Sequence, residues 1–345
     1  MSEPRRVLVL AGGRSSERAV SLASGAAVRG GLAEHGHDVV TVEIDRAGRW
    51  YQVAEFGDGD PSVNGRLISV TPGEGALGAD VVFPVLHGPY GEDGVMQGLL
   101  EALDVAYVGS GVAASAICLD KLLFKEIAGR AGIPQVAYVA IEAAEWGSDR
   151  RNRDRLLGAA AELGFPSFVK PARLGSSVGI SRVAAATDLE PAIETALGYD
   201  PRVIVEANAG GDEIECSVLG NRELDVSQPG KLEFDGDWYD FEAKYAHGGM
   251  RLVAPAPVGE SLEIEICSLA ARAFRTAGCA GMARVDFFVD GDEVLVNEIN
   301  TIPGFTPTSV FARLFEASGM AYGDLLDRLL ELAMERHAQT RSFSF

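Results

Sequence analysis

The first 120 residues alternate between short runs that are mostly apolar and longer segments that have one apolar face. The first run, VLVLA at 7–11, ends in two glycines. Further strands are expected at 39–44, 81–86 and 105–108, with helical patterns between them at 21–35 and 94–103. A run that is apolar at every position is typical of a strand buried on both faces of a parallel sheet. Strands and helices in this order predict a doubly wound parallel sheet.

The pattern changes beyond residue 120, where short strands and helices mix in an α+β order. A helix at 122–131 is followed by Gly132 and Pro134, which are stop signals. Further on we expect strands at 165–171 and 203–206, a strand pair within 281–300, and a last helix at 323–337 that packs back. We therefore predict an α/β domain at 1–120, a small α+β domain at 121–208 and a C-terminal domain at 209–345.

Two stretches lack this regularity. Residues 50–78 are polar and rich in glycine, and we expect a hairpin and loop insertion there. Residues 145–155 carry four arginines, Arg150, Arg151, Arg153 and Arg155. For this second stretch a solvated loop is the expectation.

Composition argues against several classes of protein. The chain has 30 basic and 50 acidic residues, a net charge of −20, whereas nucleic-acid binding calls for a basic surface. No apolar run approaches the roughly 18 residues that cross a bilayer, and the amino terminus lacks a secretory signal pattern. The four cysteines lie far apart without a C-x-x-C pair, as expected of reduced thiols. We expect a soluble, cytoplasmic protein with small-molecule partners.

Two extended runs near the carboxyl end carry polar side chains in an apolar setting. Side chains alternate between the faces of a strand. Arg284 and Asp286 therefore share one face of the first strand, and Glu298 and Asn300 share one face of the second. If these faces coincide, two carboxylates and an amide oxygen converge, and such oxygen ligands are typical of Mg²⁺ sites.

The loop between the two runs decides whether the carboxylates meet. Asp286 and Glu298 lie opposite each other in a regular hairpin only if the loop has an odd number of residues. We predict a three-residue loop at 289–291, with Gly291 in the left-handed conformation. The alternative is a solvent-facing polar stripe on an edge hairpin. Phe287 and its apolar neighbours favour a core element instead.

A glycine-rich loop follows the strand that ends near Lys170. Its backbone N–H groups and the hydroxyls of Ser176 and Ser177 could hold phosphate groups. It is not a P-loop, because the pattern G-x-x-x-x-G-K-[ST] is absent from the chain. The string GSGVAA at 109–114 is a weak match to a dinucleotide fingerprint, since no acidic residue ends a second strand at the right distance.

Glu17 and His87 each follow the carboxyl end of an expected strand in the first sheet. Open α/β sheets bind ligands at this edge. Taken alone, Glu17 could be a helix-terminal charge and His87 a loop residue bonded to backbone. Together they favour a shared site.

With these motifs in place, the chain resembles the D-alanine–D-alanine ligases, an ATP-grasp family, over nearly its whole length. The motifs occur in the family's order: 12–21, 87–94, 109–121, 170–179, 242–245, 284–287 and 297–305. The resemblance implies an α/β amino-terminal domain followed by a two-domain ATP-grasp fold. It also implies a homodimer. The spacing from Asp286 to Glu298 is one residue shorter than is usual in the family, so the turn between them must differ.

The implied activity is the ATP-dependent joining of two D-alanine molecules, through a D-alanyl phosphate, for peptidoglycan synthesis. One alternative is another ATP-grasp carboxylate–amine ligase, or a D-alanine–D-lactate ligase. Tyr245 favours D-alanine over D-lactate as the second substrate. A nucleotide-binding regulatory protein without catalysis is a further alternative, but it would have no use for Arg284 beside a metal site.

The resemblance also implies which residues bind ATP and its metal ions. Ligands of two Mg²⁺ or Mn²⁺ ions would be Asp286, Asn300 and a bridging Glu298. Contacts to the phosphates would come from Lys121, Lys170, Lys244, Ser176 and Ser177. Glu206 would contact the adenine and Glu213 the ribose.

A second set of implied roles concerns the amino-acid substrates. Glu17 would receive the ammonium group of the first D-alanine, with Ser176 and Tyr245 as its partners on closing loops and His87 nearby. The oxyanion hole would consist of Arg284 and the backbone N–H of Gly304. Ser309 would hold the carboxylate of the second substrate.

Overall fold

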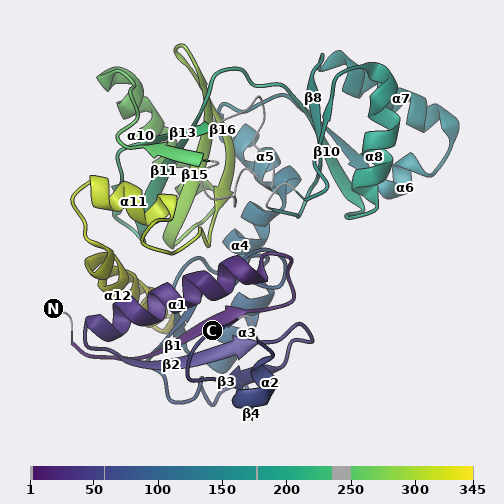
Figure 1. The fold of residues 1–345 in the computed structure, drawn as a ribbon. Coiled ribbons are helices and arrows are strands. Elements are labelled where there is room, and N and C mark those ends of the chain that lie inside the picture. The colour runs from purple at the N-terminus through teal and green to yellow at the C-terminus, as the bar shows by residue number, and fades with distance from the viewer. Residues whose placement is uncertain (1–2, 58, 176–177, 235–249, 345) are drawn as a thin grey trace.

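The computed structural model describes residues 3–57, 59–175, 178–234 and 250–344, which form three sheets with flanking helices (Figure 1). The first sheet has the strand order β4-β3-β2-β1-β5-β6. Four of its strands are parallel: β1 (Arg6–Gly12), β2 (Asp38–Ile44), β5 (Val81–Pro84) and β6 (Ala106–Tyr107). The predicted doubly wound sheet is confirmed.

Alternate residues of β1 face two separate cores, which explains the apolar run at 7–11. Val7 and Val9 pack with helices α1 (Arg18–Glu34) and α12 (Tyr322–Arg341). Leu8 and Leu10 pack on the other face with α3 (Val95–Leu103). Helix α12 comes from the carboxyl end of the chain and lies beside α1, so the last helix does pack back (Figure 1).

The insertion expected at 50–78 extends the first sheet. It contains β3 (Trp50–Gln52), α2 (Pro61–Asn64) and β4 (Arg66–Ile68). The two strands pair antiparallel with each other, and β3 pairs antiparallel with β2. The hairpin expected here is therefore present, but the sheet is mixed rather than purely parallel.

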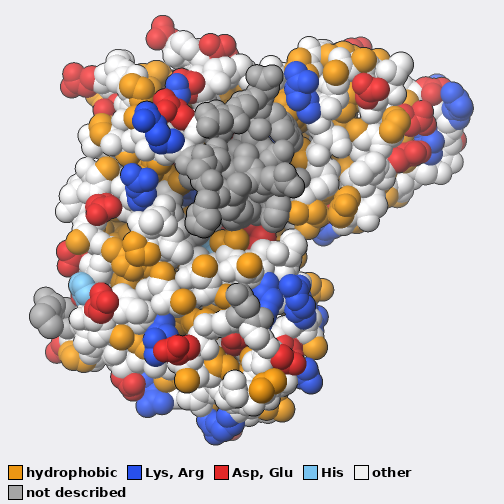
Figure 2. Space-filling model, in the orientation of Figure 1, with side chains coloured by type: hydrophobic (Ala, Val, Ile, Leu, Met, Phe, Trp, Pro, Cys, Tyr) orange, Lys and Arg blue, Asp and Glu red, His pale blue; other side chains and the backbone are white. Residues whose placement is uncertain are grey.

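The second sheet is antiparallel and has the order β7-β10-β8-β9. Its strands are β7 (Tyr138–Glu142), β8 (Ser167–Pro171), β9 (Ser181–Val183) and β10 (Arg202–Ala207). Its helices are α6 (Ala143–Trp146), α7 (Arg150–Glu162) and α8 (Leu189–Leu197), with the short turn η1 (Ala186–Asp188). This unit projects from the rest of the molecule, and a notch separates it from the first sheet (Figure 2).

The prediction of a solvated loop at 145–155 was wrong, because most of this stretch is helical. Asp149 caps α7 by accepting a hydrogen bond from the backbone N–H of Asn152 at 2.8 Å. Arg153 pairs with Glu190 at 3.0 Å, and its guanidinium lies 4.9 Å from the ring centroid of Trp146. Arginine is a good helix former, and the cap and these contacts favour a helix over a loop.

The third sheet has the order β14-β13-β11-β15-β16, and β12 also pairs with β11. Its strands are β11 (Asp212–Gly220), β12 (Leu224–Val226), β13 (Gly230–Phe234), β14 (Met250–Val253), β15 (Gly281–Asp290) and β16 (Glu293–Asn300). The neighbouring helices are α4 (Val112–Leu119), α5 (Lys121–Arg130), α10 (Glu260–Thr276) and α11 (Val310–Ala317). Val285 and Phe287 of β15 enter the core shared with α10. Arg284 and Asp286 therefore lie on the opposite face.

The prediction of a three-residue loop between β15 and β16 was also wrong. Asp290 pairs with Glu293, so the turn has two residues, and Gly291 is left-handed as expected, with φ of 59°. Phe287 pairs with Val296, yet Asp286 pairs with Glu298. Asn297 is therefore an extra residue in a β-bulge, and the bulge brings Glu298 opposite Asp286.

Within the described residues, no helix is long and apolar enough to cross a membrane.

Candidate active site

Two adjoining cavities lie against the polar face of the third sheet. The first has a volume of about 300 Å³ and lies between the second and third sheets. The second has a volume of about 210 Å³ and is lined by residues of the third sheet and by loops of the first. Lys121 and Glu298 line both cavities. Every predicted site residue that the structure describes lines at least one of them.

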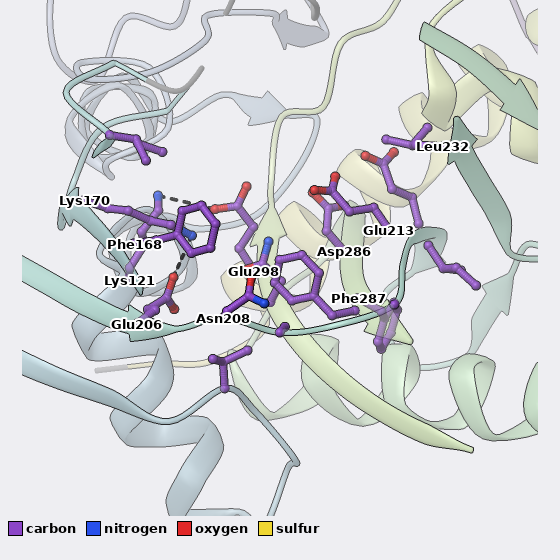
Figure 3. Close-up of a pocket in the computed structure, with 18 of the residues that line it drawn as sticks. Lys121, Phe168, Lys170, Glu206, Asn208, Glu213, Leu232, Asp286, Phe287 and Glu298 are labelled. Atoms are coloured by element: carbon purple, nitrogen blue, oxygen red, sulfur yellow. Dashed lines mark ion pairs between the residues drawn. The ribbon is translucent and has the colours of Figure 1, made fainter. Parts of the chain in front are cut away.

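The first cavity contains the residues predicted to contact ATP. Figure 3 shows Lys121, Lys170 and Glu206 on one side, Asp286 and Glu213 on the other, and Glu298 between them. The second cavity is lined by Glu17, His87, Arg284, Asn300, Gly304 and Ser309. Four predicted residues, Ser176, Ser177, Lys244 and Tyr245, lie outside the described residues.

Local structure explains the positions of Lys121 and Lys170. Asp120 caps α5 by accepting hydrogen bonds from the N–H groups of Leu122 and Leu123, both at 3.1 Å, which fixes Lys121 in the first turn. Lys121 Nζ then lies 3.3 Å from Glu298 Oε2. In β8, Val169 faces the core of the second sheet, so Lys170 faces the cavity.

Glu206 is buried between two lysines. Its Oε2 lies 2.6 Å from Lys170 Nζ, and its Oε1 lies 2.8 Å from Lys125 Nζ. Burial by itself would raise the pKa of Glu206, but the two ammonium groups outweigh burial and lower the pKa to about 2. The Glu206 carboxylate is therefore charged throughout the physiological pH range.

Arg284 joins the acidic residues of the third sheet. Its guanidinium donates two hydrogen bonds to Asp286, both of 2.7 Å, and Nε lies 2.9 Å from Glu215 Oε2. Burial would lower the pKa of Arg284, but these carboxylates raise it well above its ordinary value. Asp286 also accepts a hydrogen bond of 3.0 Å from Asn300 Nδ2.

The donor set at the junction of the cavities fits a hard divalent cation. Asp286 and Glu298 are opposed across the paired strands, and Asn300 is bonded to Asp286. All three side chains offer oxygen ligands, which Mg²⁺ prefers. In the part of the chain that the structure describes, no cluster of three or more His, Cys, Asp or Glu side chains is arranged to hold a metal. The predicted set differs from such a cluster because one of its members is an amide.

In the second cavity, Glu17 precedes α1 and His87 follows β5. Ser15 Oγ accepts a hydrogen bond of 3.1 Å from the N–H of Glu17 and so shapes its turn. His87 is only 5% exposed, and both of its ring nitrogens have protein partners. Burial, as the main cause, lowers the pKa of His87 and keeps its ring neutral.

Gly304 and Ser309 lie close together before α11. A Cβ atom on Gly304 would lie 3.2 Å from Ser309 Oγ. Ser309 Oγ accepts a hydrogen bond of 3.0 Å from the N–H of Thr306 and lies 2.8 Å from Thr306 Oγ1. These contacts hold Ser309 at the wall of the second cavity, at the start of α11.

Sequence reasoning missed several residues of the site. Lys125 stands one helical turn beyond Lys121 in α5, and that spacing was the available signal. Glu215 shares a face of β11 with Glu213 and pairs with Asp286 in the sheet. Glu92 accepts hydrogen bonds from Gly88 and Ile302, and burial, followed by the charge of Glu17, raises its pKa to about 8. The apolar wall of the first cavity was missed too; it includes Val136, Phe168, Ile180, Leu232 and Phe288.

Comparison with known proteins gives a consistent result. Residues 6–110 match the family model "D-ala D-ala ligase N-terminus", and residues 127–331 match "D-ala D-ala ligase C-terminus". A D-alanine–D-alanine ligase of Deinococcus radiodurans is 45% identical over 96% of this chain and 99% of its own length. One from Kineococcus radiotolerans is 42% identical over 97% of this chain and 98% of its own length.

Solved structures agree with the sequence comparisons. The D-alanine–D-alanine ligase of Coxiella burnetii is 36% identical, with a TM-score of 0.86, over 99% of this chain and 97% of that one. The VanG D-Ala:D-Ser ligase of Enterococcus faecalis is 32% identical, with a TM-score of 0.84, over 96% of this chain and 100% of that one. The predicted ATP-grasp fold is confirmed by this likeness. The chain belongs to the D-alanine–D-alanine ligase family.

Proposed function

We propose that this chain joins two D-alanine molecules into D-alanyl-D-alanine, with ATP converted to ADP and phosphate, as a step in peptidoglycan precursor synthesis. The observation that carries the proposal is the meeting of two cavities at Lys121 and Glu298. One cavity offers lysines and an apolar wall, which suit a nucleotide. The other offers Glu17 and Arg284, which suit an amino acid and a developing oxyanion.

ATP would lie in the first cavity. Lys121 and Lys170, together with Lys244 and the serines of the glycine-rich loop, would bind its phosphates. The adenine would pack on the apolar wall beside Glu206, and Glu213 would hold the ribose. Lys170 would then exchange part of its contact with Glu206 for a phosphate oxygen.

Two Mg²⁺ or Mn²⁺ ions would be held by Asp286, Glu298 and Asn300, with Glu298 shared. When bound, such ions neutralise phosphate charge and orient the triphosphate. Asn300 would turn its amide oxygen toward them, and Asp286 would share its carboxylate between Arg284 and a cation.

The first step would join the first D-alanine to phosphate. Glu17 would hold the ammonium group, so that the carboxylate faces the first cavity across Lys121. A carboxylate oxygen attacks the γ-phosphorus of ATP, the bond to ADP breaks, and an acyl phosphate forms. Positioning and charge neutralisation supply most of the catalysis in such a transfer. Loops that carry Ser176 and Tyr245 would exclude water, which would otherwise hydrolyse the acyl phosphate.

The second step would form the peptide bond. With its carboxylate held by Ser309, the second D-alanine attacks the acyl carbon through its amine. The negative oxygen of the tetrahedral intermediate would be stabilised by Arg284 and the N–H of Gly304. One such preorganised donor is worth about 3 kcal/mol. Phosphate then leaves, and the amine loses its proton.

Three coarser expectations complete the proposal. The domains would divide at about residues 120 and 208, each with one of the three sheets as its main element. The active unit would be a homodimer in the cytoplasm, where ATP is available. Light scattering coupled to gel filtration measures the mass of the particle directly, and a monomer would contradict this part.

The substrate assignment is tested by phosphate release from ATP. The assay compares D-alanine, L-alanine, D-alanine with D-lactate, and D-alanine with D-serine, the last because a relative is named a D-Ala:D-Ser ligase. Products are identified by mass spectrometry. We expect D-alanyl-D-alanine as the main product. A predominant depsipeptide or mixed dipeptide would favour one of the other ligase activities, and no D-amino-acid dependence would refute the proposal.

Glu298→Gln tests the assignment of the metal ligands. Loss of a residue that only orients a metal ligand costs about 10–100-fold, so loss of a shared ligand should lower turnover at least about a hundredfold. Glu293→Gln is the matched control, because Glu293 is an exposed carboxylate on the same strand. Near-normal turnover of Glu298→Gln at ordinary Mg²⁺ concentration would remove Glu298 from the metal site.

A further inference from the structure

The segment 302–305, which follows β16, is held by side chains from distant parts of the chain. Ile302 offers its carbonyl oxygen to His87 Nδ1 at 2.9 Å and its N–H to Glu92 Oε1 at 3.3 Å. Phe305 donates its N–H to Ser24 Oγ at 3.1 Å. The Tyr322 hydroxyl donates to the carbonyl of Phe305 at 2.9 Å. The backbone is thus fixed at both ends of the segment.

Ser24 and His87 act on this segment as one unit. Ser24 is fully buried in α1, and its Oγ lies 3.2 Å from His87 Nε2. Because the Ile302 carbonyl can only accept, Nδ1 of the neutral His87 ring is the donor, and Nε2 accepts the hydroxyl proton of Ser24. His87 Nδ1 then carries the ring hydrogen and donates it to the carbonyl of Ile302. Every polar atom of the two side chains is satisfied in this one arrangement.

These hydrogen bonds on either side hold Gly304, whose N–H the proposed peptide-bond formation would use. Pro303 has no N–H, so Gly304 provides the remaining donor of the segment. Over the residues that the structure describes, the hydrogen bonds include none donated by the Gly304 N–H. Gly304 lines the second cavity together with Arg284. The N–H is therefore available to a ligand.

We propose that Ser24 is a positioning residue which, through His87 and the backbone of Phe305, directs the Gly304 N–H at the oxyanion of the tetrahedral intermediate. This inference rests on the proposed function, because only peptide-bond formation creates that oxyanion. The physical reason for a clamp is the tolerance of such a donor, which must lie about 2.7–3.1 Å from the oxyanion. A misplacement of about 1 Å can cost a hundredfold in rate.

Ser24→Ala is the first test. Alanine is a good helix former, so α1 should persist, while the N–H of Phe305 and His87 Nε2 lose their partner. We expect kcat to fall about tenfold or more, with KM for ATP and for D-alanine unchanged within about twofold. Ser115→Ala is the matched control. Ser115 is also fully buried in a helix, but among the residues described its hydroxyl bonds only to the carbonyl of Ser110, at 3.5 Å.

Separating the two chemical steps gives a readout that a merely structural role would not change. Acyl phosphate formation has no tetrahedral carbon intermediate. We would measure this first step by positional isotope exchange in ATP labelled with ¹⁸O at the β,γ-bridge, in the presence of D-alanine. In Ser24→Ala we expect exchange to persist while dipeptide formation falls, so that the ratio of exchange to turnover rises. The double variant Ser24→Ala/His87→Asn should lose little more than its more impaired parent, because the two residues act together.

The outcomes separate this inference from the proposed function. Unchanged kcat in Ser24→Ala, or equal loss of exchange and dipeptide formation, would overturn the positioning role. If Ser24→Ala does not fold, Tyr322→Phe removes another bond to the same segment, and it should raise the same ratio; an unchanged ratio would again overturn the inference. A wild-type chain without D-alanine-dependent phosphate release would instead refute the proposed function.

Discussion

Lys125 offers the sharpest test of how the nucleotide cavity is stabilised. Its side chain is almost fully buried, with 1% exposure, and Nζ lies 2.8 Å from Glu206 Oε1. Lys125→Met keeps an unbranched side chain of similar length and removes the ammonium group, with its charge and its hydrogen-bond donors. Glu206 then retains Lys170 as a partner but loses one of the two ammonium groups that outweigh its burial.

The expected cost follows from the pKa of Glu206. A fall of the pKa from 4.5 to about 2 corresponds to about 3 kcal/mol in favour of the charged form. Removal of one partner from a buried ion pair typically costs about 3–5 kcal/mol. Because Lys170 remains, we expect Lys125→Met to lower the free energy of unfolding by about 2–3 kcal/mol at pH 7.

The assay is chemical denaturation of wild type, Lys125→Met, Glu206→Gln and the double variant. Because the cost arises from an uncompensated carboxylate, Lys125→Met should cost under about 1 kcal/mol when it is combined with Glu206→Gln. Lys231→Met is the control, since Lys231 pairs with Asp212 at the same distance of 2.8 Å but near the surface. That pair should contribute about 1 kcal/mol or less. Equal losses with and without Glu206→Gln would refute the electrostatic argument and assign the effect to packing of the lysine stem.

The same pair predicts a pH dependence. The pKa of Glu206 is lowered in the folded chain, so its contribution to stability is fully present above the unfolded value of 4.5. It is lost as the pH falls from 4.5 toward 2. The stability difference between wild type and Glu206→Gln should therefore shrink over this interval, and a difference that grows on acidification would contradict the assignment.

Two further predictions concern the backbone and the thiols. Gly211→Ala should lower the free energy of unfolding, measured by chemical denaturation, by at least about 3 kcal/mol, because φ is +83° and the new Cβ would overlap the carbonyl oxygen of Val289. The control Gly132→Ala, with φ of +67° and nothing within 4 Å of the new Cβ, should lower it by about 1 kcal/mol. Equal losses in the two variants would be inconsistent with a clash. Iodoacetamide should label Cys267 before Cys118, as measured by peptide mass mapping. A hydrogen bond with Cys216 lowers the pKa of the half-buried Cys267, whereas a hydrogen bond with Cys279, and then burial, raise the pKa of Cys118. Labelling of both thiols at equal rates would contradict this.

Much of the fold could be predicted from local patterns. β1, β5 and β6 were visible because burial on both faces leaves no polar position in their apolar runs, whereas β2 also buries the polar side chains of Thr41 and Glu43. The helix at 150–162 was missed because its arginines dominate the composition, whereas the cap at Asp149 and the contacts of Arg153 decide its structure. Helix propensity and the N-terminal cap therefore favour a helix here, although the charged composition is typical of a loop.

The hairpin of β15 and β16 shows where pattern reasoning reaches its limit. The opposition of Asp286 and Glu298 was predicted, but by a loop that does not exist. A phase change in the apolar positions, from Val294 and Val296 to Ile299, marks the bulge at Asn297. Once the core fixes Val296 and Ile299 inward, an extra residue between them is the way for Glu298 to face the cavity.

The sequence by itself determined the parallel strands of the first sheet, the strands near 165–171 and 203–206 and the strand pair within 281–300. It also determined the family motifs and the chemical types of side chain at the site. These depend on burial patterns and on residue identity, which are properties of the chain alone. Tertiary structure decided the partners: Lys125 with Glu206, Glu215 with Arg284, and Ser24 with His87 and Phe305. Each set joins elements far apart in sequence, and only packing of the sheets and helices brings their polar atoms within bonding distance.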